Sequence, residues 1–550
     1  MKYLFTLLSF LILPLTIISS DGIDNPYLIT ATMSQEGVDA GMKILEKGGT
    51  AMDAALSVAL SEIAETSGKH VSYAGKMNLL YFEAGTGEIH SMNASFNSLL
   101  NEKDPSTIPI RNVHNLDDTE YPSSYGRTIL VPGFMKGVQE AHKKFGSIPF
   151  TNLFENAINI AERGRPWNYE DDYNFKKWKK TLTRYPETKS VFTKPNGMYY
   201  EIGDTFQQPE LARTLKKVSN DGADYMYKGE WATKFVAAAR DLGSKITMKD
   251  LENYEVVWSK PVKGKYEGYD IYSLGQPGLG GVRLLETLNI VENNKLSEFG
   301  HYSKSPCTLA MLFQILQATQ YSSYFSIYQP DYFGDSIDLS FESRLNRKTS
   351  EMIWEKWMQM RDVEDCTIQN YGSSHSAAVV AIDKWGNMIA LLHTINTINW
   401  GFSGLFVDGI SIPDPAGEQK DLLTIAGQGN KIPDWTNPGI ILNKGQPLLG
   451  FSCINSGHHN QTIAAIIDVL DFDMSPQESV ESPSIGKLDF IQDVLHLLIE
   501  PNRFSDSLLI DARNLNSYLL EDKQVKGGSW TGIHRCPETG KLSGTKVWLK

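Results

Sequence analysis

Residues 371–387 read YGSSHSAAVVAIDKWGN and place a group of hydroxyl side chains directly before an apolar stretch. Ser373, Ser374 and Ser376 flank a histidine, His375, at the start of this stretch. A serine hydroxyl becomes a nucleophile when a base lies within hydrogen-bond reach of it. The same residues also fit a polar loop that enters a hairpin. The stretch is therefore a candidate nucleophile site, and the rest of the chain decides between the two interpretations.

A glycine-rich stretch is the second candidate for chemistry. Residues 269–291, YDIYSLGQPGLGGVRLLETLNIV, predict a strand, a loop and a helix. That order suits phosphate binding at a helix N-terminus. The loop reads GxxGxGG rather than GxGxxG, however, and it lacks the Lys-Ser/Thr pair of a P-loop. We expect a turn in which the backbone passes close to its neighbours, and no nucleotide cofactor.

The histidine pair His458-His459 is the third candidate. Adjacent side chains on a strand point to opposite faces, so the pair is poorly placed to bind one metal ion. No HExxH motif or similar ligand set accompanies it. We expect both histidines in a loop or at a helix start, and we predict no metal site.

Composition and charge narrow the classes of function. The chain has 550 residues, 41% of them hydrophobic, and a net charge of -13. It contains no dense block of Lys or Arg, which argues against nucleic-acid binding. The length favours a two-lobed fold or two domains.

The N-terminus has the pattern of a secretory signal. Lys2 precedes an apolar run over residues 3–18, which small residues close. We therefore predict a signal peptide over residues 1–20 and a secreted protein. An uncleaved membrane anchor is the alternative, but the run is short for a span and Pro14 interrupts it.

The patterning of the mature chain predicts layers of helices and sheets. Apolar residues at helical spacing over residues 35–47 and an Ala-rich run over 51–65 predict two helices. Mostly apolar strands flank the turn KWGN after residue 376, which suggests a sheet covered on both faces. The expected class is a layered α+β sandwich.

The order of several stretches resembles that of a known family. AGMKILEKGGTAMDAALSVAL, VPGFMKGVQEAHKKFGSIPFTNLFENAINIAERG, ITMKDLENYEV, YEGYDIYSLGQPGLGGV and TGIHRCPETGKLSG follow one another along the chain. Together they resemble the gamma-glutamyltranspeptidase (glutathione hydrolase) family of N-terminal-nucleophile hydrolases. The resemblance implies a four-layer αββα sandwich and a chain that cuts itself to expose a new N-terminal nucleophile.

The position of that nucleophile follows from counting along the strand. The family pattern is Thr-Thr-His, an apolar run, and then Asp-x-x-Gly-Asn. Counting back without gaps from Asp383 places the nucleophile at Ser376. Alignment on the histidine would choose Ser373, but it requires an insertion that a strand tolerates badly. We predict cleavage between His375 and Ser376.

The cleavage would divide the chain into two subunits that remain associated. Residues 21–375 would form the large subunit region, and residues 376–550 would form the small one. By resemblance the substrate is a small molecule. The further site residues implied are a hydroxyl beside the nucleophile, a substrate-binding amide, a carboxylate for the substrate's α-amine and two oxyanion-hole positions: Thr394, Asn396, Asp414 (with Asp408 as the alternative), Gly457 and His458.

Two substrate-binding motifs of the family are altered here. The arginine that would grip a glutamyl α-carboxylate should fall within HSMNASFN, and no arginine is present. The family's Ser-Ser-Met-Ser-Pro loop appears as DWTNP, residues 434–438. The leading hypothesis is a gamma-glutamyltransferase or glutathione hydrolase that works through an acyl-enzyme on Ser376. The alternatives are an amidase or acylase with another acyl specificity, and a secreted scaffold without activity.

Overall fold

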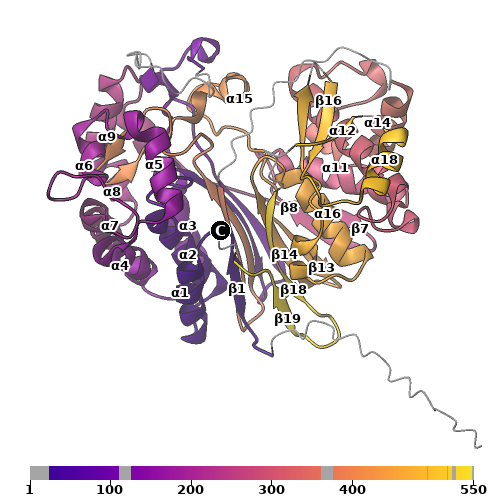
Figure 1. Cartoon of the computed structure of the whole chain (residues 1–550), viewed down its shortest axis with the longest axis horizontal. Coiled ribbons are helices and arrows are strands. Elements are labelled where there is room, and N and C mark those ends of the chain that lie inside the picture. The colour runs from indigo at the N-terminus through magenta and orange to yellow at the C-terminus, as the bar shows by residue number, and fades with distance from the viewer. Residues whose placement is uncertain are drawn as a thin grey trace, which may run out of the picture.

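Two sheets lie face to face between two layers of helices (Figure 1). The computed structural model describes residues 24–110, 125–360, 376–491, 494–516, 518–522 and 528–547. The first sheet is six-stranded and antiparallel throughout. Its strands, in spatial order, are β1 (Leu28–Ala31), β9 (Ser376–Ile382), β10 (Met388–Thr394), β2 (Lys76–Glu83), β3 (Glu88–Ala94) and β6 (Val257–Ser259).

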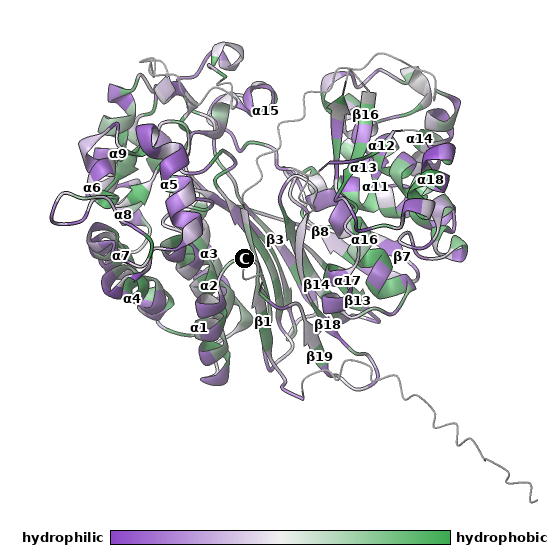
Figure 2. Ribbon diagram, in the orientation of Figure 1, coloured by the Kyte–Doolittle hydropathy of each residue, from purple (hydrophilic) through white to green (hydrophobic). Residues whose placement is uncertain are grey.

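The second sheet also has six strands, and all its pairs are antiparallel. In spatial order they are β19 (Leu542–Gly544), β18 (Ser529–Arg535), β14 (Gln446–Ile454), β13 (Gly439–Asn443), β8 (Tyr269–Ser273) and β7 (Val262–Tyr266). Apolar side chains from both sheets fill the space between them, including Leu80, Val380 and Ile440. Figure 2 shows these central strands as mostly hydrophobic.

Helix α2 (Ala51–Glu65) packs directly on the outer face of the first sheet. Its N-cap Thr50 and Asp53 form a capping box that satisfies exposed backbone N–H groups. Small alanine side chains let this helix lie close to β9, as the sequence suggested. Further helices of this lobe are α1 (Gln35–Glu46), α3 (Phe134–Phe145), α4 (Glu155–Arg163), α5 (Tyr169–Leu182), α6 (Pro186–Val191), α7 (Pro209–Asp221), α8 (Asp224–Tyr227), α9 (Glu230–Asp241), α10 (Met248–Glu252) and α15 (Lys420–Ala426).

The second sheet is covered by α11 (Gly280–Asn293) and α16 (His458–Asp471), which share one apolar core with it. The other helices of this lobe are α12 (Pro306–Tyr328), α13 (Phe341–Arg344), α14 (Arg347–Gln359), α17 (Pro476–Glu481) and α18 (Asp506–Leu515). Short strands complete the fold: β4 (Arg165–Pro166), β5 (Thr205–Phe206), β11 (Phe406–Val407), β12 (Ile410–Ser411), β15 (Lys487–Ile491), β16 (Val494–Ile499) and β17 (Leu519–Glu521).

The predicted four-layer αββα sandwich is confirmed. The glycine-rich stretch forms β8, a loop and α11, and the histidine pair opens α16, as the patterns predicted. Strands β9 and β10 lie in the middle of the first sheet, between β1 and β2. Segments from both sides of residue 376 therefore build one sheet. Among the described helices, none is both long and apolar enough to cross a bilayer.

Candidate active site

Ser376 is the first residue of β9, and two other polar side chains lie in register with it. Thr394 is its direct partner on β10, and Lys76 on β2 is the partner of Thr394. Directly opposed residues of antiparallel strands project to one face, with Cβ atoms about 4.5–5.5 Å apart. The hydroxyls of Ser376 and Thr394 and the ammonium of Lys76 thus form one row across three adjacent strands, at one end of the sheet.

The row faces the second sheet. Ala378 and Leu392, the next opposed pair on the same face, pack against Ile454 at the end of β14. Ser376 is partly exposed, whereas the rest of β9 is buried. The predicted nucleophile therefore lies at the partly exposed end of β9, on the face that packs against the second sheet. The alternative candidates Ser373 and Ser374 lie outside the described residues.

The histidine beside Thr394 points away from this row. His393 lies on the opposite face, where its Nε2 is 2.8 Å from the Glu62 Oε2 atom. Both side chains are fully buried. Burial lowers the pKa of His393 to about 3 and raises the pKa of Glu62 well above its usual value, which favours the neutral form of each. His393 is consequently no base for the Ser376 hydroxyl.

The chain leaves β10 through a tight turn at Asn396. This residue has a φ of 51°, a left-handed conformation that asparagine adopts more readily than most residues. Its backbone N–H donates to the Thr394 Oγ1 atom at 3.1 Å. The turn brings Asn396, a predicted substrate contact, next to the hydroxyl row.

Asp414 anchors the loop that follows this turn. Its carboxylate accepts hydrogen bonds from the Thr397 hydroxyl at 3.2 Å and from the N–H groups of Phe402 and Ser403 at 3.0 and 2.7 Å. Burial raises its pKa, and these donors oppose the rise. Asp414 therefore lies beside the site, with three of its hydrogen bonds made to its own loop.

Two other carboxylates, Asp408 and Glu418, are close to Asp414 in the sequence and differ in their surroundings. Asp408, the alternative candidate, pairs with Lys234 on the surface of α9. Glu418 was not singled out from the sequence, yet burial and the nearby charge of Asp414 raise its pKa to about 7. Glu418 follows Asp414 by four residues, across the short turn Pro415–Gly417. The sequence did not indicate that its carboxyl group would be buried.

Gly457 and His458 lie at the start of α16, directly after β14. A Cβ at Gly457 would lie 2.5 Å from the carbonyl oxygen of Gly486, so only glycine fits. The His458 ring nitrogens lie 3.0 Å from the Asn455 carbonyl and 3.1 Å from that of Trp435. Burial lowers the His458 pKa, and the two carbonyls oppose this. The imidazole thus ties the start of α16 to the 434–436 loop.

Arg283 places a positive charge beside the same helix start. It lies on α11 one turn before Thr287, whose hydroxyl is 3.1 Å from the His459 Nε2 atom. The Arg283 Nε is buried, and none of the described residues accepts a hydrogen bond from it. Burial and then the charge of Arg344 lower the pKa of this guanidinium to about 9, so it stays charged at neutral pH.

Lys76, the third member of the row, forms a buried ion pair with Asp434. The same carboxylate oxygen accepts hydrogen bonds from Asn78 and Ser95, each at 2.8 Å. Burial alone would raise the Asp434 pKa, but the charge and hydrogen bond of Lys76 and the hydrogen bonds from Thr436 hold it well below its usual value. The sequence analysis did not single out Lys76 or Asn78. The signal that could have revealed them is the presence of two polar residues, Lys76 and Asn78, at the start of an otherwise apolar strand.

The end of β3 supplies neutral groups where the family arginine was expected. Asn93 is the register partner of Asn78 and is 2% exposed. Its Oδ1 accepts from the Ser95 N–H at 3.0 Å. Its Nδ2 is buried, and no described residue accepts from it. This face of β3 is polar but carries no cation.

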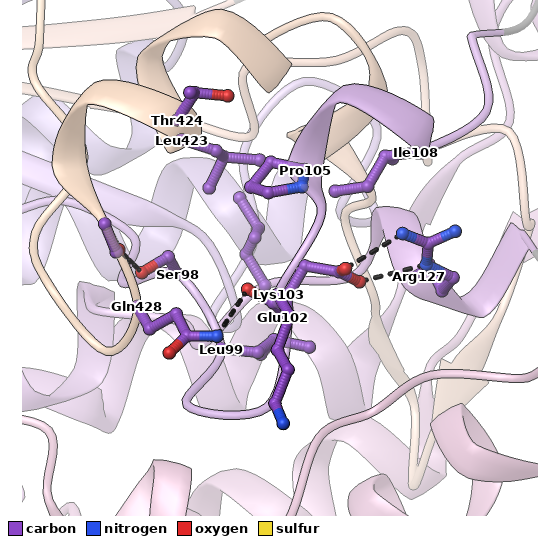
Figure 3. Close-up of a pocket in the computed structure, with 12 residues that line it drawn as sticks. Ser98, Leu99, Glu102, Lys103, Pro105, Ile108, Arg127, Leu423, Thr424 and Gln428 are labelled. Carbon is purple, nitrogen blue, oxygen red and sulfur yellow. Dashed lines mark hydrogen bonds and ion pairs between the residues drawn. The ribbon is translucent and has the colours of Figure 1, made fainter.

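A cavity of about 180 Å³ lies between residues 98–108, 127–130 and 423–428 (Figure 3). Figure 3 shows Glu102 facing Arg127, and the two form a bidentate pair at 2.8 and 2.9 Å. Ser98 donates to the Gly427 carbonyl across the cavity rim. The Arg127 charge is therefore neutralised. Among the described residues, no cluster of three or more His, Cys, Asp or Glu side chains is placed to hold a metal ion.

The family model for gamma-glutamyltranspeptidase matches residues 37–546. The chain belongs to the gamma-glutamyltranspeptidase family. The match includes both lobes and the row that contains Ser376. Membership accounts for the fold and for the collinear stretches.

The chain is similar to proteins of known name and to solved structures. A glutathione hydrolase proenzyme of Bacillus subtilis (strain 168) is 26% identical over 495 residues, which cover 83% of this chain and 80% of the relative. A cephalosporin acylase from Bacillus halodurans superposes with a TM-score of 0.72 at 20% identity, over 98% and 97% of the two chains. Gamma-glutamyltranspeptidase of Helicobacter pylori gives a TM-score of 0.50 at 26% identity, over 59% of this chain and 89% of that one.

Proposed function

We propose that this chain is an autoprocessed amide hydrolase and acyltransferase whose N-terminal nucleophile is Ser376. The observation that carries the proposal is the position of Ser376. It is the partly exposed first residue of a central strand, and the hydroxyl-bearing Thr394 lies directly opposite. Denaturing electrophoresis with sequencing of each fragment tests the proposal, together with release of amine from an amide substrate.

Self-cleavage would proceed by attack of the Ser376 Oγ on the carbonyl carbon of residue 375. The peptide C–N bond breaks, an ester forms at Oγ, and the Ser376 nitrogen takes up a proton to become a free amine. Water then hydrolyses the ester, which regenerates the hydroxyl and leaves a carboxylate on residue 375. Two associated subunits from one chain are the expected product, because β9 and β10 share a sheet with β1 and β2.

In turnover, the freed α-amine of Ser376 would accept the Oγ proton as Oγ attacks the substrate carbonyl. The amine then gives this proton to the leaving nitrogen, and an acyl-enzyme remains. Water or an acceptor amine completes the reaction. Thr394 would position the nucleophile, and Asn396 would contact the acyl group. The backbone N–H of Gly457 would stabilise the oxyanion, with Arg283 adding positive potential. The backbone N–H of His458, the second predicted position, donates to the Asn455 carbonyl at 3.1 Å.

Gamma-glutamyl amides such as glutathione are the first substrate class to test. The name of the Bacillus subtilis relative supports this choice, as does the pair of carboxylates at Asp414 and Glu418, which could face a substrate α-amine. An amidase or acylase with another acyl group is the second candidate. The absence of arginine from β3 and the neutralised charge of Lys76 favour it.

The pH dependence of hydrolysis tests the proposed base. An α-amine has an unperturbed pKa of about 7.7–8.0 and must be unprotonated to act. We therefore expect kcat/KM to rise from pH 5 through about pH 8 and to level off roughly one pH unit higher. Initial rates of hydrolysis of a chromogenic anilide, recorded across this pH range, measure the dependence of kcat/KM on pH. A rate that falls steadily over the same range would exclude the α-amine as the base.

The missing arginine predicts weak binding of glutathione. A charge-assisted hydrogen-bonded pair contributes about 1.5–3 kcal/mol, so its loss raises KM roughly ten- to a hundred-fold. The measurement is a side-by-side assay with a family member that retains the arginine. An equal KM in both enzymes would contradict the prediction and would indicate a substitute cation.

We also propose that the protein is secreted after removal of about its first 20 residues. Expression in a secreting host should then release protein whose large fragment begins near residue 21. N-terminal sequencing of protein from the medium measures this directly. Recovery of Lys2 in the secreted fragment, or retention in membranes after a carbonate wash, would favour the anchor.

A further inference from the structure

Lys76 and its neighbours form a carboxylate-binding site on the face of the sheet that carries Ser376. One oxygen of Asp434 is paired with the Lys76 ammonium and accepts from Asn78 and Ser95, each at 2.8 Å. The other oxygen accepts from the Thr436 N–H, also at 2.8 Å. The side chains of Lys76 and Asp434 are only 3% and 1% exposed. The occupant of this site is the chain's own carboxylate.

The site lies where the carboxylate of a gamma-glutamyl group would reach. Lys76 is two strands from Ser376 in one row, which places their Cα atoms about 10 Å apart at about 4.8 Å per strand. In a gamma-glutamyl group, four C–C bonds separate the carboxylate carbon from the carbonyl carbon that Oγ attacks. Bonds of about 1.5 Å let this group span about 5 Å. Because this span starts at the carbonyl carbon, beyond the Ser376 Oγ atom, the carboxylate would reach the Lys76–Asp434 pair.

We propose that Asp434 occupies the place of a substrate carboxylate, so that the acyl group accepted by this site is uncharged at that position. The inference rests on the proposed function and names its substrate class. A second carboxylate would meet the negative charge of Asp434 instead of a free ammonium, in a setting that solvates charge poorly.

The surrounding groups suit a neutral, polar acyl chain. Asn93 lies on the same face as Asn78. Its Nδ2 is buried and has no acceptor among the described residues. A neutral oxygen of a substrate would accept the hydrogen bond that this group can donate. The ammonium of the nearby Lys431 already has two partners. It donates to the Glu255 carbonyl at 2.8 Å and lies 3.6 Å from the centre of the Tyr254 ring.

Four 4-nitroanilides test the proposal because they vary two groups independently. The gamma-glutamyl and glutaryl compounds carry the distal carboxylate, whereas the 4-aminobutyryl and butyryl compounds lack it. For the self-cleaved wild-type protein, we expect kcat/KM to be at least roughly tenfold higher for the two compounds without the carboxylate. A wild-type preference for the compounds with it would overturn the proposal and would direct attention to Arg283.

Variants test whether Asp434 is the cause. Asp434→Ser opens space and frees Lys76, so the preference should shift toward the carboxylate compounds by roughly tenfold or more. Adding Lys76→Met to this variant should abolish the shift. The matched control is Asp270→Ser, which removes the partner of Lys263 in a surface pair and should leave the preference unchanged. An unchanged preference in Asp434→Ser would overturn the proposal.

The isosteric Asp434→Asn variant keeps the shape of the site, and it provides the same test if the serine variant does not fold. If the wild-type chain neither cleaves itself nor hydrolyses any anilide, the proposed function fails, and calorimetry tests the inference separately. Glutarate should then bind Asp434→Asn roughly tenfold or more tightly than it binds the wild type, with butyrate unaffected. Equal glutarate affinities would overturn the inference.

Discussion

Ser376→Ala is expected to yield a single intact and inactive chain, whereas the wild-type chain separates into two fragments under denaturing conditions. The substitution removes the attacking oxygen but leaves a residue that fits the start of β9, so the fold should be unaffected. The wild-type fragments should span about residues 21–375 and residues 376–550. Denaturing electrophoresis and N-terminal sequencing measure both outcomes.

Two control variants separate Ser376 from its neighbours. Ser373→Ala removes the rival hydroxyl and should still be cut between His375 and Ser376. Ser376→Thr restores the residue type of the family and should also be cut, because the hydroxyl and the future α-amine are both retained. A small fragment that begins at Ser373 or Ser374 would show the ungapped count to be wrong. A wild-type chain that stays whole would support the scaffold hypothesis.

The sequence predicted the layers and the row's first two members because these depend on local periodicity and on collinear motifs. The apolar strands around the turn KWGN became β9 and β10, and their register follows from the short turn. Ser376 and Thr394 are therefore register partners. The hydrogen bond between them that the resemblance implied stays a prediction. The cut itself stays a prediction, since residues 361–375 lie outside the described part of the chain.

Contacts between segments that are far apart in the sequence could not be predicted from local periodicity or from motifs. Lys76 and Asp434 are separated by 358 positions. Lys76 belongs to no motif, and Asp434 lies in a loop that keeps only the proline of the family motif. Glu418 is close to Asp414 in the sequence, but its pKa is raised chiefly because folding buries it. The altered loop DWTNP appeared as a loss of substrate-binding residues. In the structure its aspartate is the partner of a cation on the nucleophile's face.

Lys76→Met is expected to destabilise the protein strongly, because it leaves the buried Asp434 carboxylate without its cation. Removing one partner of a buried ion pair typically costs about 3–5 kcal/mol. Methionine keeps much of the length of the lysine stem, so loss of packing contributes little. The effect is best measured as a fall in the urea midpoint in the Ser376→Ala background, where every sample is one covalent chain.

Adding Asp434→Asn to Lys76→Met should restore most of the lost stability, because the double variant buries two neutral side chains in place of one unpaired charge. The matched surface control is Lys263→Met. Lys263 pairs with Asp270 at 3.1 Å, but half of its side chain is exposed, so we expect a loss below about 1 kcal/mol. If Lys76→Met and Lys263→Met shift the midpoint equally, the Lys76–Asp434 charges are solvated in solution. The site beside Ser376 would then be open enough for a substrate carboxylate to compete with Asp434.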